Sequence, residues 1–212
     1  MGSEMCIRDR MHVVGVDKCE LQLQRNKTNS VSILGDVETM AFKPGSVDMV
    51  VCFDVLEHLK NPFKALSNFD ESLKPEGLVL LAFPNIWSLK GLVTVLTPYW
   101  FHKLFYRFVI GDKTAMLEEG RQFKTYLGPK LSYQRVMNFF NERSYKPHIS
   151  ELYQGPVPEH LSNKNAFYKF AFLAVSVIGK LLTFGKVDLR HSDVFILLQK
   201  PNSSQMNEVK HV

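Results

Sequence analysis

Residues 47–59, VDMVVCFDVLEHL, decide the fold of this chain. The continuously apolar run Met49–Phe53 predicts a parallel strand at the centre of a sheet, buried on both faces. The character changes at Asp54, where we expect a short helix capped by Asp54, with Glu57 completing a capping box. Ligands of open α/β sheets lie at the carboxyl ends of such strands, so residues 53–58 are predicted to line the functional site.

A strand–helix–strand unit continues from this stretch. Asn61 and Pro62 predict an N-cap and a first helical position, and the helix should run to Leu73. The sequence KPEG at 74–77 favours a turn, and a fully apolar strand follows over 78–83. This order predicts a βαβ unit with two parallel strands.

The flanking regions add elements of the same kind. Two short strands are expected over 12–16 and 31–34, with a polar helix between them. After position 130 we expect an amphipathic helix over 131–143, capped by Ser132, and strands over 146–153 and 194–199. The pattern as a whole predicts an α/β domain.

Composition and charge limit the class of protein further. The chain has 212 residues, of which 45% are hydrophobic and 22% charged, as expected for one soluble domain. Its three cysteines do not make a disulfide framework, so a cytoplasmic setting is favoured. The net charge of +5 comes from scattered lysines and arginines, without a nucleic-acid-binding motif, so nucleic acid is not expected as a partner.

We divide the chain into three parts. Residues 1–10 (MGSEMCIRDR) have no periodicity and are expected to be non-native or disordered. Residues 11–200 form the domain, with an aromatic lid insertion over about 86–130, and 201–212 form a flexible tail. Within the domain, the apolar segment 166–184 is close to the roughly 20 residues of a membrane span but carries two lysines. A helix packed on the sheet or lid is preferred there, and peripheral membrane contact is the alternative.

Four segments together resemble the class I S-adenosylmethionine-dependent methyltransferases, in particular the small-molecule branch that includes ubiquinone-methyltransferase-like proteins. They are VVGVD at 13–17, GDVETMAF at 35–42, SVDMVVCFDVLEHL at 46–59 and LKPEGLVLLAFPN at 73–85. FKTYL at 123–127 matches more loosely. The resemblance implies a Rossmann-like, mostly parallel, doubly wound sheet with an antiparallel last strand, and S-adenosylmethionine as cofactor.

The resemblance also implies roles for residues on the cofactor side. Asp17 would accept hydrogen bonds from the ribose hydroxyls, as an acid does in dinucleotide folds, or serve only as a helix cap. Asp36 would accept from the adenine amino group and the Val37 N–H would meet a ring nitrogen, unless the pair forms only a turn. The full set of cofactor-binding candidates is Asp17, Lys18, Asp36, Val37, Cys52 and Phe53.

On the acceptor side, methyl transfer to a hydroxyl needs a base, and His58 is the candidate. The alternative is that His58 only packs or hydrogen-bonds. Asp54, Glu57 and His58 share one helix face and resemble a cluster proposed to hold a divalent ion in some quinone O-methyltransferases. Because helix capping already explains the presence of Asp54 and Glu57, no metal is predicted. The residues expected to contact substrate are Glu57, Asn85, Tyr99 and Trp100.

One part of the family pattern is not found. A first strand with a glycine-rich loop should lie roughly 20 residues before Asp17, by analogy with dinucleotide-binding folds. Only Gly2 and Gly15 occur there. We therefore expect a break in the middle of the sheet and weak or no cofactor binding by these 212 residues, which a tight calorimetric titration with S-adenosylmethionine would contradict.

Two other classes stay open. A short-chain dehydrogenase using a nicotinamide cofactor would also suit an acid after the second strand, and Tyr99 and Lys103 have its Tyr-x-x-x-Lys spacing. A non-catalytic, membrane-apposed binding module would use the lid and the 166–184 helix. For the methyltransferase, the aromatic lid favours a small hydrophobic acceptor, with O-methylation as the expected reaction. The sequence does not set the oligomeric state.

Overall fold

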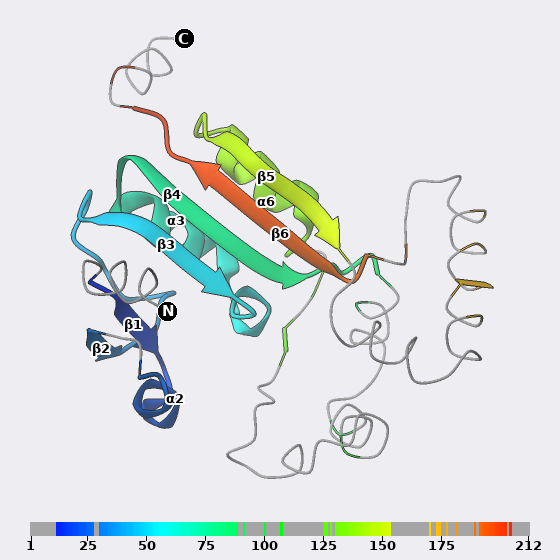
Figure 1. Ribbon diagram of the computed structural model, residues 1–212, viewed down its shortest axis with the longest axis horizontal. Coiled ribbons are helices and arrows are strands. Elements are labelled where there is room, and N and C mark those ends of the chain that lie inside the picture. Colours follow the sequence, from blue (N-terminus) through cyan, green and yellow to red (C-terminus); the bar gives the residue numbers. More distant parts are fainter. Residues whose placement is uncertain are drawn as a thin grey trace, which may run out of the picture.

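The computed structural model describes residues 12–27, 30–88, 130–153 and 191–202, together with the single residues 91, 100, 107, 125, 126, 128, 170, 173, 174, 177, 181, 189 and 204. Most of this part belongs to two sheets and the helices beside them (Figure 1).

The larger sheet has four strands in the order β3-β4-β6-β5. They span Val47–Phe53 (β3), Leu73–Pro84 (β4), Asp193–Gln199 (β6) and Lys146–Tyr153 (β5). β3 and β4 run parallel, while β6 is antiparallel to both β4 and β5. The predicted α/β class, with a parallel βαβ unit and an antiparallel last strand, is confirmed.

The smaller sheet contains two parallel strands, β1 (Val14–Asp17) and β2 (Val31–Leu34). Helix α2 (Glu20–Arg25) connects them. Within the described residues no strand lies between β1 and β3, so β1–β2 and the four-stranded sheet are not joined by a backbone ladder. The sequence predicted a break at this position.

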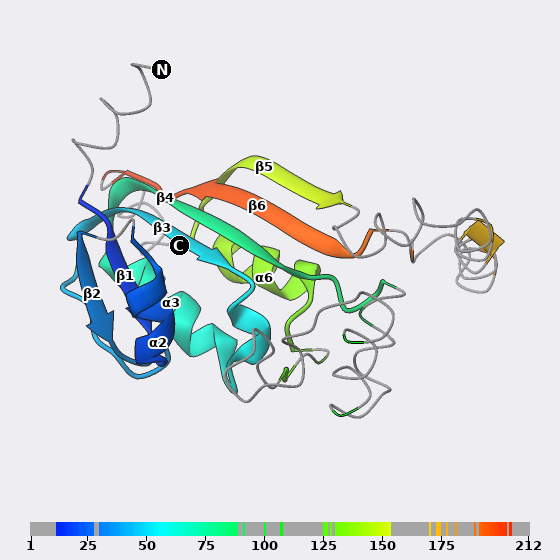
Figure 2. The same cartoon turned by 60° about the horizontal axis from the view of Figure 1, so that its bottom comes forward.

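The core lies on one face of the larger sheet. Helices α3 (Pro62–Ser72) and α6 (Tyr133–Asn141) both pack there, as Figure 2 shows. Alternate residues of β4 and β6 point toward these helices because successive strand side chains face opposite sides. The side chains that are fully buried in this way include Val79, Leu81, Phe83, Val194, Ile196, Leu66, Val136 and Phe140.

The prediction that β3 is buried on both faces is wrong. Met49, Val51 and Phe53 are 38%, 56% and 46% exposed, whereas Cys52 is buried. These residues alternate along the strand, so each set belongs to one face. The helices of the described part cover only the face of Cys52, and this leaves the other apolar set accessible (Figure 2).

The structure confirms the predicted ends of some helices and strands and differs from the prediction at others. Ser132 caps α6 by accepting the Arg135 N–H at 3.4 Å, and Pro62 is the first residue of α3. Asn61 occupies the N-cap position of α3, but its side chain makes no capping bond. β4 begins at Leu73, directly after α3, so the predicted turn at 74–77 lies within its bounds, where the pairing with β3 skips from Leu73 to Leu78 and Glu76 has a left-handed φ of 64°.

The one-sided core predicts unequal effects for two valines on neighbouring strands. Replacing buried Val79 by Ala should lower the free energy of unfolding by about 2 kcal/mol, because two methyl groups leave a packed core. The matched change Val51→Ala, at a side chain 56% exposed, should cost about 0.5 kcal/mol or less. Urea denaturation measures both, and equal losses would show that the exposed face of β3 is covered in solution.

Candidate functional site

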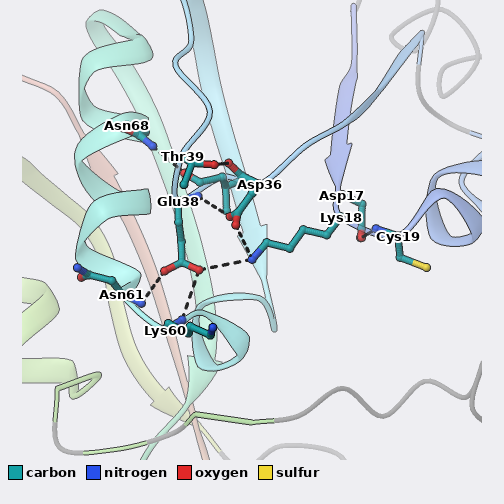
Figure 3. A network of polar contacts seen from close by, with 10 residues as sticks. Asp17, Lys18, Cys19, Asp36, Glu38, Thr39, Lys60, Asn61 and Asn68 are labelled. Atoms are coloured by element: carbon teal, nitrogen blue, oxygen red, sulfur yellow. Dashed lines mark hydrogen bonds and ion pairs between the residues drawn. The ribbon is translucent and has the colours of Figure 1, made fainter.

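The predicted cofactor residues gather where β1, β2 and β3 end. Asp17 is the last residue of β1, Asp36 follows β2 by two positions, and Phe53 ends β3. Glu38, just beyond β2, hydrogen-bonds the backbone of Asn61, which lies a few residues beyond the end of β3. The carboxyl ends of all three strands therefore face the same region (Figure 3).

Asp17 uses one oxygen for local structure. Its Oδ1 accepts the N–H of Cys19 at 2.7 Å. The N-cap position of α2 is Cys19, so the prediction that Asp17 itself occupies the N-cap is wrong by two residues. Among the described residues Oδ2 of Asp17 has no hydrogen-bond donor, and this oxygen is able to accept from a ligand hydroxyl.

Asp36 and Val37 present an acceptor and a donor side by side. The Asp36 Oδ1 accepts the N–H of Glu38 at 2.8 Å, and Thr39 and Met40 donate to the Asp36 carbonyl, which closes a tight turn. The Val37 N–H, in contrast, has no acceptor within the described part of the chain. A carboxylate beside a backbone N–H matches the amino group and ring nitrogen of adenine.

Lys18 contacts both acidic side chains of the turn after β2, Asp36 and Glu38. Its Nζ lies 2.8 Å from Asp36 Oδ2 and 3.5 Å from Glu38 Oε2. Burial opposes the ionisation of Asp36, but the hydrogen bonds from Lys18 and from the Glu38 N–H outweigh it and lower the pKa of this carboxyl. The hydrogen bond to Asp36 in turn raises the pKa of Lys18 against a smaller effect of burial. Both groups are thus charged at neutral pH.

The chain turns sharply after β3. The Asp54 N–H donates to the Ala82 carbonyl at 2.9 Å, which extends the parallel pairing by one residue. Asp54 then adopts a left-handed conformation with φ 52°, which Asp tolerates better than most residues. Only a three-residue 3-10 turn, η1 (Leu56–His58), follows. The predicted capping box is therefore wrong, because the turn begins after Val55 and no side chain caps it.

Glu57 and His58 lie together in η1. Glu57 is buried, whereas the His58 side chain is 26% exposed, and the His58 Nε2 lies 3.9 Å from the Glu57 Oε1. The Glu57 carbonyl accepts the N–H of Tyr126 at 2.6 Å, so part of the FKTYL segment contacts this corner. The imidazole is thus accessible and lies near a buried carboxylate, at a distance longer than a hydrogen bond.

Cys52 and Phe53 do not line the same surface. Cys52 packs in the core, where burial, followed by the charges of Glu57 and Asp54, raises the pKa of its thiol to about 12. Phe53 points to the other face, where its ring lies 6.1 Å from that of Phe195. Only Phe53 can therefore offer its side chain to a ligand on the exposed face.

The remaining predicted substrate residues are only partly described. Asn85 is buried, and its amide donates to the His191 carbonyl at 2.9 Å and accepts the Trp87 N–H at 3.1 Å, so it holds together local structure. Trp100 is exposed, and Tyr99 lies outside the described residues, as does most of the predicted lid.

Two further questions concern metals and membranes. The described part of the chain contains no group of three His, Cys, Asp or Glu side chains arranged to hold a metal ion, at Asp54–His58 or elsewhere. None of the helices in the described part of the chain has the length and apolar character to cross a bilayer. The helical residues Phe170, Leu173, Val177 and Leu181 expose apolar side chains. Peripheral membrane contact through 166–184 stays a prediction, which liposome flotation would test.

Two residues of this region were not found by sequence reasoning. Glu38 accepts backbone N–H groups of Lys60 and Asn61, and Asn68 donates to the Val37 carbonyl at 2.7 Å. Both contacts link positions more than twenty residues apart. Glu38 lies inside the quoted GDVETMAF segment, but no local pattern indicates its partners.

Acidic residues at the ends of two adjacent parallel strands, with an accessible corner after a third, are typical of Rossmann-like nucleotide-binding folds. A family model described as a methyltransferase domain matches residues 2–81. The first part of the chain is thus similar to a methyltransferase domain, a class whose methyl donor is S-adenosylmethionine, and the fold of the described residues agrees with this similarity. The match favours methyl transfer over the dehydrogenase.

Solved structures share the fold at low sequence identity. A methyltransferase from Archaeoglobus fulgidus has 14% identity and a TM-score of 0.51, with 93% of this chain and 80% of that one covered. One from Mesorhizobium loti also has 14% identity and a TM-score of 0.51, covering 89% and 80%. A complex of a methyltransferase activator, Trm112, with a protein described as a methyltransferase from Haloferax volcanii has 11% identity and a TM-score of 0.54, covering 94% and 77%. No curated protein matches the chain.

The environment of Cys52 predicts an unreactive thiol. In a Cys6→Ser/Cys19→Ser background, Cys52 should resist a thiol reagent from pH 7 to pH 9, because a pKa raised to about 12 leaves almost no thiolate and the side chain is buried. Unfolding in urea should restore ordinary reactivity. Rapid modification of the folded variant at pH 8 would contradict the buried position.

Proposed function

We propose that this methyltransferase acts on a hydroxyl of a small hydrophobic molecule, with the cofactor's nucleoside at the ends of β1 and β2 and the acceptor beside Phe53 and His58. One observation carries the proposal. Lys18, the residue directly after Asp17, reaches Asp36 at 2.8 Å, so the two candidate carboxylates face the same end of the sheet.

The chemistry of these groups fits the nucleoside. Asp17 keeps an oxygen for the ribose hydroxyls, and each Asp36 oxygen can accept a further bond beside the one it already has. The Val37 N–H supplies the donor that a ring nitrogen needs. Together, the Asp36 carboxylate and the Val37 N–H would distinguish adenine from bases that lack an amino group at the same position.

When bound, S-adenosylmethionine supplies an electrophilic methyl group on a sulfonium. The residues of the chain have simpler tasks: they orient the acceptor, exclude water and receive a proton. Phe53 offers an apolar face, which suits a reaction in which positive charge is lost. His58 would take the hydroxyl proton, and the Glu57 carboxylate, 3.9 Å away, would attract the resulting imidazolium.

The cofactor half of the proposal predicts a loss of binding on removing either carboxylate. Asp17→Ala and Asp36→Ala should each weaken binding of S-adenosylhomocysteine about tenfold or more, because each removes an acceptor for charge-assisted hydrogen bonds. Ligand-observed NMR is the suitable measurement, since the sequence predicts weak affinity. Asp48→Ala, an exposed carboxylate at the other end of β3, is the matched control.

Unchanged binding in both variants would place the nucleoside elsewhere. A wild-type chain that shows no signal with the ligand at high concentration would contradict cofactor binding by these 212 residues.

The acceptor half predicts a specific role for His58. The assay uses methyl-labelled cofactor at saturating concentration and a panel of phenols and quinols as acceptors. The labelled methyl group should be transferred to a hydrophobic product, which is recovered by extraction into an organic solvent. His58→Gln should lower this rate about 100-fold or more, which is the lower range for loss of a general base. Its cofactor affinity should not change. Equal rates in the two proteins would leave His58 with a packing role, and label confined to water-soluble products would contradict a hydrophobic acceptor.

A further inference from the structure

Glu38 lies between the two sheets at the end where the candidate site is found. Its side chain is only 10% exposed, although it is a carboxylate on a loop. A carboxylate this shielded needs hydrogen-bond donors to offset the loss of water. Figure 3 shows it pointing away from the turn that carries Asp36 and toward the segment before α3.

Lys18 Nζ, beside β1, lies 3.5 Å from Glu38 Oε2, and the two backbone donors come from the larger sheet's side. The N–H of Asn61 donates to Glu38 Oε1 at 2.6 Å, and the N–H of Lys60 donates to Oε2 at 3.4 Å. Bonds from backbone N–H to an ionised carboxylate are stronger than those between neutral groups. The negative charge also lies near the start of α3, where the helix dipole favours it.

A second contact holds the same turn. The Asn68 amide, in α3, donates to the Val37 carbonyl at 2.7 Å. The turn from Asp36 to Met40 is closed internally by the bonds of Thr39 and Met40 to the Asp36 carbonyl. The turn is therefore bonded internally, and α3 and the residues before it hold the turn at Glu38 and at Val37.

These contacts matter because no backbone ladder joins β2 or β1 to β3 within the described residues. The position of Asp36 relative to the corner after β3 is set by side chains instead. Of these contacts, that of Glu38 leads to the carboxylate of Asp36, since the Glu38 N–H donates to Asp36 Oδ1 at 2.8 Å.

We propose that Glu38 is a positioning residue for recognition of the adenine base: through Lys60 and Asn61 it fixes the Asp36 carboxylate and the Val37 N–H relative to α3 and the corner after β3. Glu38 does not itself contact the base. This role rests on the proposed adenine site at Asp36 and Val37.

The test compares two ligands that differ in one group. S-adenosylhomocysteine carries the amino group that Asp36 would accept, and S-inosylhomocysteine has a carbonyl oxygen there. Competition measured by ligand-observed NMR on the whole chain gives the ratio of their affinities. The wild-type protein should prefer the adenine ligand about tenfold or more, because a site built for a donor rejects an analogue that lacks it.

Glu38→Ala should bring this ratio close to one, since Asp36 and the Val37 N–H are no longer held in register. Glu38→Gln keeps an oxygen for the Asn61 N–H and should retain the ratio within about twofold. Asp48→Ala, the control at an exposed ion-paired carboxylate, should change nothing. A general loss of structure would weaken both ligands alike and leave the ratio intact, so the ratio separates positioning from folding.

The outcomes are distinguishable. If the wild-type protein does not prefer the adenine ligand, the proposed adenine site is wrong and the role of Glu38 falls with it. If the wild-type protein discriminates and Glu38→Ala discriminates equally, only the role of Glu38 is overturned. Hydrogen exchange of residues 35–40 gives a second measure: Glu38→Ala should speed it, and unchanged exchange would also count against the proposal.

Discussion

The pairing of β4 on both of its edges is the constraint on which the described structure depends. β4 runs parallel to β3 and antiparallel to β6, and its Val79, Leu81 and Phe83 side chains are fully buried against α3 and α6. The same pairing decides where β3 stops. Phe53 lies opposite Ala82, and the Asp54 N–H still bonds Ala82 before the chain turns away. The corner that carries Glu57 and His58 is therefore located by the core.

The cofactor end is held in a different way. β1 and β2 form a short parallel pair of their own, and Lys18 ties the end of β1 to the turn after β2. Side-chain bonds of Glu38 and Asn68 connect that turn to the rest. Individual side-chain bonds are weaker and more easily exchanged than a strand ladder. The corner after β3 is thus located by the packed core, whereas the position of the ends of β1 and β2 depends on a few polar contacts.

Local patterns predicted most of the elements and some of the site. The bounds of β2 and β5, the end of β3 and the cap at Ser132 follow from alternation, apolar runs and capping chemistry, which are properties of neighbouring residues. The burial of β3 on both faces could not be judged in this way, because exposure depends on which elements cover each face.

The site shows the same limit. Asp17, which ends β1, and Asp36, two positions after β2, could be predicted because the family resemblance places acidic residues at strand ends. Glu38 and Asn68 could not, since their partners are set by the fold rather than by nearby residues. The conformation of Asp54 was missed for a related reason: the chain must reverse after its bond to Ala82, and that bond involves a distant strand.

The open edges of β1 and β3 bear on how this protein behaves in solution. Val14 and Val51 expose apolar side chains on strands that pair on one edge only in the described part. Such edges pair readily with strands of other molecules. Two copies meeting there would compete with a ligand at the strand ends. Pairing of this kind would make the apparent affinity for a ligand depend on the protein concentration.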